Sequence, residues 1–231
     1  MKYKDIKIIY EDNHLLVVEK PSGILTQADD TKDLDMYNLL KEYIRVEYNK
    51  PGEAWLGIVH RLDQPVAGVM VFAKTSKAAS RLSNQIRLNE WKKQYLVITN
   101  NVPHENKAIY TDYLYKDRRN NNSYVVDKNH PNSKYSVLSN EVISTNENKA
   151  LLKVDLETGR SHQIRVQLAS RNIPIYGDFR YNDKPKKNSD LKLFAYKLEI
   201  IHPTKKERMT FMSKPKLTGQ WIKFKKELDQ L

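Results

Sequence analysis

The sequence predicts an α+β fold in which a mixed, mostly antiparallel β-sheet is flanked by helices. Many short runs of β-branched and aromatic residues are joined by short polar connections, and short connections favour antiparallel pairing. Two segments, residues 33–48 and 76–87, instead repeat apolar residues at helical spacing. The chain has 231 residues without an internal repeat or a clear linker, so we expect a single domain over residues 1–231.

The first third of the chain is expected to combine strands with helices. Four strands are predicted, each a short apolar run bounded by polar, Gly or Pro residues: residues 6–10, 15–20, 56–59 and 68–73. The helix predicted over residues 33–48 has Thr31 or Asp33 available as its N-cap. The helix predicted over residues 76–87 begins at Ser76, which is a suitable N-cap residue.

The rest of the chain is expected to consist mainly of antiparallel strands. Their predicted ranges are residues 95–99, 109–116, 123–126, 135–144, 150–156, 194–201 and 208–211. A helix capped by Ser161 would place Ile164 and Leu168 on its buried face. Another helix is predicted from about Thr218, and residues 184–190 form a basic loop.

The composition indicates a polyanionic partner. Lys and Arg total 40 against 28 Asp and Glu, which gives a formal net charge of +12. A balance of this size predicts attraction to nucleic acid or to an anionic membrane face. No stretch of about 18 apolar residues could span a bilayer, and no signal peptide is recognisable, so we expect no membrane association. The chain has no cysteine, which excludes disulfides and fits a cytoplasmic location.

One aspartate stands in a loop where chemistry is favoured. His60, Arg61 and Asp63 precede a turn marked by Pro65 and Gly68, and an apolar strand follows. Loops that enter rigid strands often carry function, and an aspartate can act as a nucleophile or a general base without a cofactor. The plainer interpretation is a surface ion pair, which contributes little to stability. On the residues alone both interpretations stay open.

A second stretch, residues 158–168, combines basic residues with the start of a predicted helix. Arg165 is adjacent to the apolar face formed by Ile164 and Leu168, so we expect it at the rim of the buried surface. An arginine there is costly unless a carboxylate meets it. The plain interpretation of Arg165 is therefore one end of a structural ion pair.

Several other chemistries lack their signatures. The 7 glycines do not cluster into a phosphate-binding loop, so no nucleotide cofactor is expected. Neither Ser22 nor Ser161 lies in a Gly-x-Ser-x-Gly elbow. The spacing of His60, Asp63 and His162 matches no usual set of metal ligands, so no metal is expected either. A lone carboxylate among basic groups and tyrosines remains, and an RNA base is a compatible substrate.

These motifs resemble those of the RluA-type pseudouridine synthases. The loop His60-Arg61-Leu62-Asp63, followed by Gly68 and by residues 72–75, is similar to that family's catalytic motif. Residues 158–166 resemble its third motif. Further similar segments keep the family's order between about Ile8 and Trp221: residues 11–23, 93–95, 174–178, 195–198 and 202–203. The resemblance implies a pseudouridine-synthase-like fold.

The resemblance also implies roles for individual residues. Asp63 would be the nucleophile, and Arg165 would pair with it and keep it ionised. Tyr95 would stack on the target uracil and could serve as the base that removes a proton. RNA contacts are implied for His60, Arg61, Arg160 and Gln163.

The implied reaction converts uridine to pseudouridine in tRNA or rRNA without a cofactor. Asp63 would add to the nucleotide, either at C1′ of the ribose or at the pyrimidine ring, and the base would then turn so that C5 bonds to C1′. A stacked base cannot turn in this way, so the target must be extruded or unpaired, and Arg61 would help to stabilise the flipped state. Lys and Arg contacts with the RNA backbone would offset the unstacking.

The chain departs from the family pattern at a few positions. Val66-Ala67-Gly68 stands where Thr-Ser-Gly is frequent, and Gln167 stands where a histidine is frequent. The chain begins almost at the first motif, so we expect a stand-alone catalytic domain without the S4 RNA-binding domain of many relatives. RNA is the expected partner, and a monomer is favoured although the oligomeric state stays open.

Two other functions remain as alternatives. A catalytically silent RNA-binding or ribosome-assembly module could keep this fold, but it would not need Asp63, Tyr95 and Arg165 together. A metal-dependent nuclease could use His60, Asp63 and His162, but the ligand spacing disfavours it.

Overall fold

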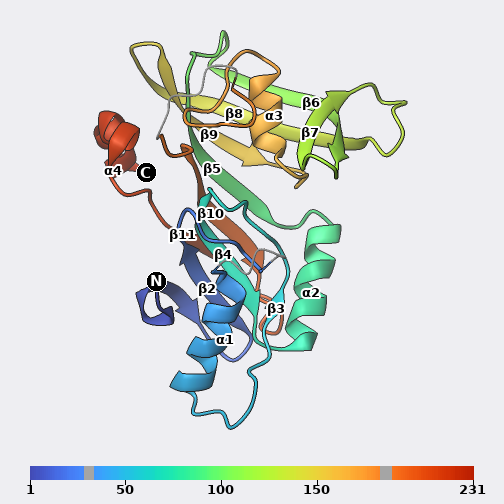
Figure 1. Cartoon of the computed structure of the whole chain (residues 1–231), viewed down its shortest axis with the longest axis vertical. Helices are drawn as coiled ribbons and strands as arrows, with labels where there is room; N and C mark the ends of the chain where they lie inside the picture. Colours follow the sequence, from blue (N-terminus) through green and yellow to red (C-terminus); the bar gives the residue numbers. More distant parts are fainter. Residues whose placement is uncertain (29–33, 183–188) are drawn as a thin grey trace. The chain divides into compact units, whose positions relative to one another are not determined.

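The computed structural model describes residues 1–28, 34–182 and 189–231. The chain divides into two compact units, which are described separately: unit 1 is Met1–Lys92 with Ala195–Ser213, and unit 2 is Lys93–Phe194 with Lys214–Leu231. Both units consist of antiparallel strands and helices (Figure 1). This confirms the predicted α+β class, with its mixed, mostly antiparallel sheet flanked by helices. The single domain over residues 1–231 stays a prediction.

Unit 1 is built on antiparallel strands, which the sequence predicts from their short apolar runs. Its strands are β1 (Lys7–Glu11), β2 (Leu15–Lys20), β3 (Gly57–Ile58), β4 (Ala67–Ala73), β10 (Leu193–Ile201, from Ala195 on) and β11 (Arg208–Met212). Its helices are the short 3-10 helix η1 (Tyr3–Asp5), α1 (Met36–Glu47) and α2 (Ser76–Arg87). Strand β2 pairs with β1 and β4, β3 pairs with β4, and β10 pairs with β11.

One hydrophobic core of unit 1 lies between its strands and α2. Alternate residues of a strand face the same side of a sheet, so every second residue along each strand contributes an apolar side chain to this core. Its largest members are Leu15, Val17, Val69, Val71, Leu82, Trp91, Leu198, Ile200 and Phe211. Full burial of such a side chain contributes about 1.5–3 kcal/mol, which fixes β4, the strand that follows the Asp63 loop.

The N-cap of α1 is Asp35, whose carboxylate accepts a hydrogen bond from the N–H of Asn38 at 2.9 Å. The two residues proposed as caps from the sequence, Thr31 and Asp33, lie outside the described residues. Asp35 satisfies one of the N–H groups that every helix leaves unpaired at its start, so the helix begins at Met36.

Two other predicted N-caps are wrong by one residue. Helix α2 is capped by Thr75 rather than Ser76, because Thr75 has the extended backbone of a cap residue and its side chain accepts an N–H from the first turn. Helix α3 follows His162 rather than Ser161. His162 has a left-handed backbone with φ of 54° and no capping bond, which the sequence pattern does not reveal.

Unit 2 contains the remaining predicted strands and the helix of the third motif. Its strands are β5 (Lys92–Thr99, from Lys93 on), β6 (Lys107–Asp117), β7 (Asn122–Val126), β8 (Lys134–Asn146) and β9 (Lys149–Leu156). They pair in the order β5-β9-β8-β6-β7, every pair antiparallel. Its helices are α3 (Gln163–Ala169), the 3-10 helix η2 (Gly219–Phe224) and α4 (Lys225–Gln230).

No helix in the described parts of either unit is long and apolar enough to cross a membrane. The basic loop predicted over residues 184–190 lies mostly outside the described residues, since residues 183–188 are not described.

The strand register of unit 2 places Tyr95 on the sheet face that α3 covers. Residues that lie directly opposite each other on paired strands are on the same face of the sheet. Tyr95 of β5 lies opposite Val154 of β9, which lies opposite Asn140 of β8. Asn140 in turn lies opposite Ala108 of β6. The same face of β6 carries Asp112, four residues after Ala108, and its carboxylate accepts a hydrogen bond from Gln167 of α3 at 2.6 Å. Gln167, which stands where the family that the motifs resemble often has a histidine, therefore holds α3 against β6.

Gly68, at the start of β4, is expected to tolerate no side chain. Its φ is +127°, and a Cβ added there would lie 2.2 Å from the carbonyl oxygen of Ala195. Gly68→Ala should therefore lower the free energy of unfolding by about 3 kcal/mol or more, measured by chemical denaturation. Gly52→Ala is the matched control, because nothing lies within 4 Å of its added Cβ. Equal stability of the two variants would contradict the close approach of β4 and Ala195.

Candidate active site

The loop that carries Asp63 is held through its backbone. The hydroxyl of Thr26 donates a hydrogen bond to the carbonyl oxygen of Leu62 at 2.9 Å. The same hydroxyl oxygen accepts a hydrogen bond from the backbone N–H of Leu62, with 3.2 Å between oxygen and nitrogen. The N–H of Val66 donates to the carbonyl oxygen of Asp63 at 3.0 Å, which closes a tight turn. Thr26, Leu62 and Val66 are buried, whereas Asp63 is half-buried. The loop thus presents the Asp63 side chain from a fixed backbone.

Lys20, at the end of β2, is fully buried and fastens the same turn. Its Nζ donates to the carbonyl oxygens of Pro21 and Gln64 at 3.0 Å and of Val66 at 2.7 Å. These three acceptors match the three N–H donors of a lysine ammonium. Burial lowers the pKa of Lys20 to about 7, and the negative charge of Asp63 opposes this lowering. No motif assigned a role to Lys20, but a lysine that ends an apolar strand was a signal that could have found it.

The buried charge of Lys20 is expected to appear as a pH-dependent stability difference between the wild-type protein and Lys20→Met. The pKa of about 7 in the folded protein lies below the ordinary value of 10.5, so between these values the unfolded chain binds more protons. Within this window the free energy of unfolding of the wild-type protein should rise relative to the variant, by up to about 1.4 kcal/mol per pH unit. Below it the difference should be constant.

Denaturation of both proteins below, within and above the window measures this difference. Parallel stability curves across the window would contradict a buried, charged Lys20. Lys20→Met should also lose activity in any assay that depends on Asp63. The substitution removes the hydrogen bonds from Lys20 to the carbonyl oxygens of Gln64 and Val66, which hold the turn that carries Asp63.

His60 and Arg61 lie in different environments. The Nε2 of His60 accepts the N–H of Val71 at 3.0 Å, and its ring meets Trp91 edge-on with 5.2 Å between ring centroids. An accepting Nε2 carries no proton, so this bond favours the neutral imidazole with its proton on Nδ1. Arg61 is exposed. His60 therefore fastens the loop to β4, and the RNA contacts of both residues stay predictions.

Arg165 is buried, and the prediction that it lies at the rim was wrong. Its guanidinium forms a bidentate ion pair with Asp178, with Nε to Oδ2 and Nη2 to Oδ1 both at 2.8 Å. Asp178 also accepts the N–H groups of Arg180 at 2.9 Å and Tyr181 at 3.2 Å. A carboxylate with this geometry allows full burial of the arginine. The structural ion pair is confirmed, and the pairing of Arg165 with Asp63 stays a prediction.

The loop before α3 is organised by Gln163. Its Oε1 accepts the Thr158 hydroxyl at 2.9 Å and the Arg160 N–H at 3.0 Å, and its Nε2 donates to the carbonyl oxygen of Val137 at 3.0 Å. The side chain is buried with 2% exposure, and its RNA contact stays a prediction. Arg160 is exposed, and its Nε donates to the carbonyl oxygen of Tyr135 at 3.0 Å.

His162, the third residue of the nuclease alternative, lies at the start of α3. Its Nδ1 is 2.7 Å from the hydroxyl oxygen of Tyr181. Across the described residues, no three His, Asp or Glu side chains gather in a way that could hold a metal ion.

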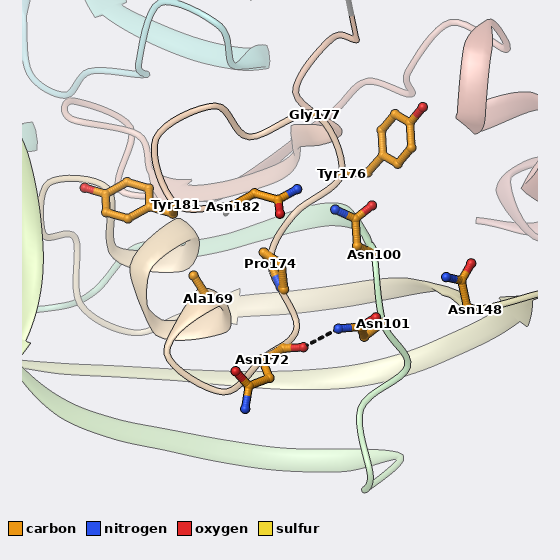
Figure 2. A pocket seen from close by; sticks show the side chains of 10 residues that line it. All are labelled: Asn100, Asn101, Asn148, Ala169, Asn172, Pro174, Tyr176, Gly177, Tyr181 and Asn182. Atoms are coloured by element: carbon orange, nitrogen blue, oxygen red, sulfur yellow. Dashed lines mark hydrogen bonds between the residues drawn. The ribbon is translucent and has the colours of Figure 1, made fainter. Parts of the chain in front are cut away.

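Unit 2 also contains a separate polar pocket of about 440 Å³. Figure 2 shows its lining residues: Asn100, Asn101, Asn148, Ala169, Asn172, Pro174, Tyr176, Gly177, Tyr181 and Asn182. The amide of Asn101 is already bonded to the carbonyl oxygen of Asn172 at 2.6 Å. None of the predicted site residues lines this pocket.

The fold is that of solved pseudouridylate synthase structures. The human RNA Pseudouridylate Synthase Domain Containing 4 aligns with a TM-score of 0.77 and 24% identity over 96% of this chain and 93% of its own. The human RNA Pseudouridylate Synthase Domain Containing 1 aligns with a TM-score of 0.76 and 19% identity over 96% and 88% of the two chains.

Residues 14–170 match the family model described as RNA pseudouridylate synthase. This range covers more than half of the chain, and the chain therefore belongs to that family, which confirms the resemblance found in its motifs.

Curated relatives agree with this assignment. The uncharacterized RNA pseudouridine synthase YhcT of Bacillus subtilis is 33% identical over 87% of this chain and 66% of its own length. An uncharacterized RNA pseudouridine synthase of Aquifex aeolicus is 34% identical over 89% and 68% of the two lengths. The ribosomal large subunit pseudouridine synthase C of Buchnera aphidicola subsp. Baizongia pistaciae is 32% identical over 87% and 64%. The chain thus spans about two thirds of the length of these relatives.

Proposed function

We propose that this protein is an RNA pseudouridine synthase, an isomerase that converts uridine to pseudouridine in tRNA or rRNA. One observation carries the proposal: the family match includes the loop in which the half-buried Asp63 stands on a backbone fixed by Thr26 and Lys20. A fixed backbone supports a nucleophile, because catalysis requires the reacting group to be held close to its productive position.

In the proposed reaction Asp63 adds covalently to the target nucleotide, at C1′ of the ribose or at the pyrimidine ring. The bond between N1 and C1′ breaks, the base turns, and a new bond forms between C5 and C1′. The proton on C5 leaves, with Tyr95 as the proposed base, and N1 gains a proton, so that substrate and product have the same atoms. The aspartate is released unchanged, and the reaction needs no cofactor.

The surroundings of Tyr95 and Arg165 support their proposed parts. Tyr95 is half-buried on β5 and shares a sheet face with α3, the helix that carries Arg165. Arg165 is held in one orientation by the bidentate contact with Asp178. We propose that it pairs with Asp63 and keeps the nucleophile ionised. The net charge of +12 supports binding to the RNA backbone.

The names of several relatives favour one RNA class for the first test. Three relatives are named ribosomal large subunit pseudouridine synthases: synthase C from two subspecies of Buchnera aphidicola, and synthase D from Borreliella burgdorferi. Large-subunit rRNA is therefore our first proposed substrate, with tRNA as the second, and a cytoplasmic location is part of the proposal.

Tritium release tests the proposal. RNA labelled with tritium at C5 of uridine loses the label when C5 bonds to C1′, so the protein should release tritium from large-subunit rRNA or from tRNA. If folded protein binds these RNAs but releases no tritium from any of them, the silent RNA-binding module becomes the better description.

A further inference from the structure

Lys93 and Arg160 place two cations together on the sheet face that carries Tyr95. Lys93 precedes Tyr95 by two residues in β5, so their side chains lie on the same face, about 7 Å apart along the strand. The Lys93 ammonium lies against Gly159, since a Cβ added to Gly159 would be 3.3 Å from Nζ. Arg160 follows Gly159 in the chain. Burial of Lys93 lowers its pKa, and the positive charge of Arg160 lowers it further.

No carboxylate neutralises this pair within the part of the chain that the structure describes. The ammonium of Lys93 forms no ion pair there, and the side chain of Arg160 has one hydrogen bond there, from Nε to the carbonyl oxygen of Tyr135, and no ion pair. Asp155 lies opposite Gln94, on the other face of the strand, and accepts its amide at 2.7 Å. Two neighbouring cations without an acid are unfavourable on their own, so the arrangement suits a bound anion.

The chemistry of the pair fits a phosphate group. Lys and Arg both form charge-assisted hydrogen bonds with phosphate oxygens, and Arg160 keeps its two terminal nitrogens for this purpose while Nε anchors it to β8. The missing side chain of Gly159 makes room for the Lys93 ammonium, since a Cβ there would lie 3.3 Å from Nζ. The anchored Arg160 loses little further freedom on binding, which favours affinity.

We propose that Lys93 and Arg160 bind one phosphate of the RNA backbone and so position the nucleotide whose base stacks on Tyr95. This inference rests on the proposed function, because it takes RNA as the ligand. The spacing of Lys93 and Tyr95 along β5 is on the scale of one nucleotide, so a strand of RNA can contact the cation with its backbone and the ring with its base.

Binding of a fluorescent oligouridine RNA at several salt concentrations tests the assignment. Lys93→Met removes the charge and keeps a side chain of similar length, and it should weaken binding about tenfold. Its slope of log affinity against log salt should be smaller by about 0.7, the value for one lost phosphate contact on a single strand. Lys93→Arg keeps the charge and should stay within about threefold of wild type.

Lys92→Met is the matched control. Lys92 is the adjacent residue on the other face of β5, and its Nζ pairs with Glu199 at 3.5 Å. Lys92→Met removes the same charge from the chain as Lys93→Met. It should change RNA affinity by less than about twofold and leave the salt slope unchanged. Lys93→Met should also be at least as stable as wild type, because it removes a half-buried charge without an acidic partner.

The outcomes separate this inference from the proposed function. Unchanged affinity and salt slope in both Lys93→Met and Arg160→Met would overturn the phosphate site, even in a protein that releases tritium. Equal losses in Lys92→Met and Lys93→Met would overturn it as well, since they would show a general charge effect. RNA affinity that depends on Lys93 in a protein that releases no tritium would support the phosphate site and reject the synthase. Arg160 is exposed, so its variant serves if Lys93→Met fails to fold.

Discussion

Asp63→Asn is expected to reduce tritium release from RNA by at least about 10⁴-fold, because an amide cannot serve as the nucleophile. RNA affinity should stay within about threefold of wild type, since binding depends on the basic surface. The substitution should leave the loop in place, because the contacts with Thr26 and Val66 involve backbone atoms and not the Asp63 carboxylate. Single-turnover tritium release and RNA binding, measured on the same preparation, check both parts.

A matched control for this variant is Asp117→Asn at the end of β6. The Asp117 carboxylate accepts the N–H of Arg119 at 2.8 Å and has no proposed part in the reaction. Its tritium release should stay within about threefold of wild type. Asp63→Ala serves as a second test, because alanine can neither react nor revert to aspartate by loss of the amide. Full activity in Asp63→Ala would remove Asp63 from the mechanism.

The local pattern of the sequence was sufficient to locate most of the fold. Strand β2 was predicted with the bounds it has, Leu15–Lys20, and α2 was predicted with its N-cap one residue late, because a periodic apolar pattern bounded by polar residues specifies such elements directly. A helix from about Thr218 was predicted and is present, but its 3-10 geometry over Gly219–Phe224 was not foreseen, nor was the left-handed backbone of His162. Both depend on backbone angles set by tertiary contacts rather than by residue type.

Site residues that lie in a sequence motif could be predicted. Site residues whose partners are brought together by the fold from distant parts of the chain could not. Asp63 was recognisable as an acid in a Pro/Gly-bounded loop. Lys20 was missed because two of its acceptors are backbone carbonyls at Gln64 and Val66, 44 and 46 residues away, and no residue type marks a carbonyl. The acid that meets Arg165 was expected, but its identity as Asp178 required the path of the chain after α3.

Asp178→Asn is expected to lower the free energy of unfolding by about 3–5 kcal/mol, because it leaves the buried guanidinium of Arg165 without its bidentate carboxylate. For a chain of this length the thermal midpoint should fall by about 6–20 °C, measured by calorimetry. Asp190→Asn is the control, since Asp190 is 84% exposed and only 3.7 Å from Lys192, and it should change stability by less than about 1 kcal/mol. A midpoint equal to that of the control would show that the buried pair contributes little.

A double variant separates the structural and catalytic parts of Arg165. Adding Arg165→Met to Asp178→Asn removes the unpaired buried charge, so most of the lost stability should return. Tritium release should nevertheless remain at least about 10²-fold below wild type, because the guanidinium proposed to keep Asp63 ionised is gone. If the double variant regained both stability and activity, Arg165 would be only a structural partner of Asp178, and the ionisation of Asp63 would need another source.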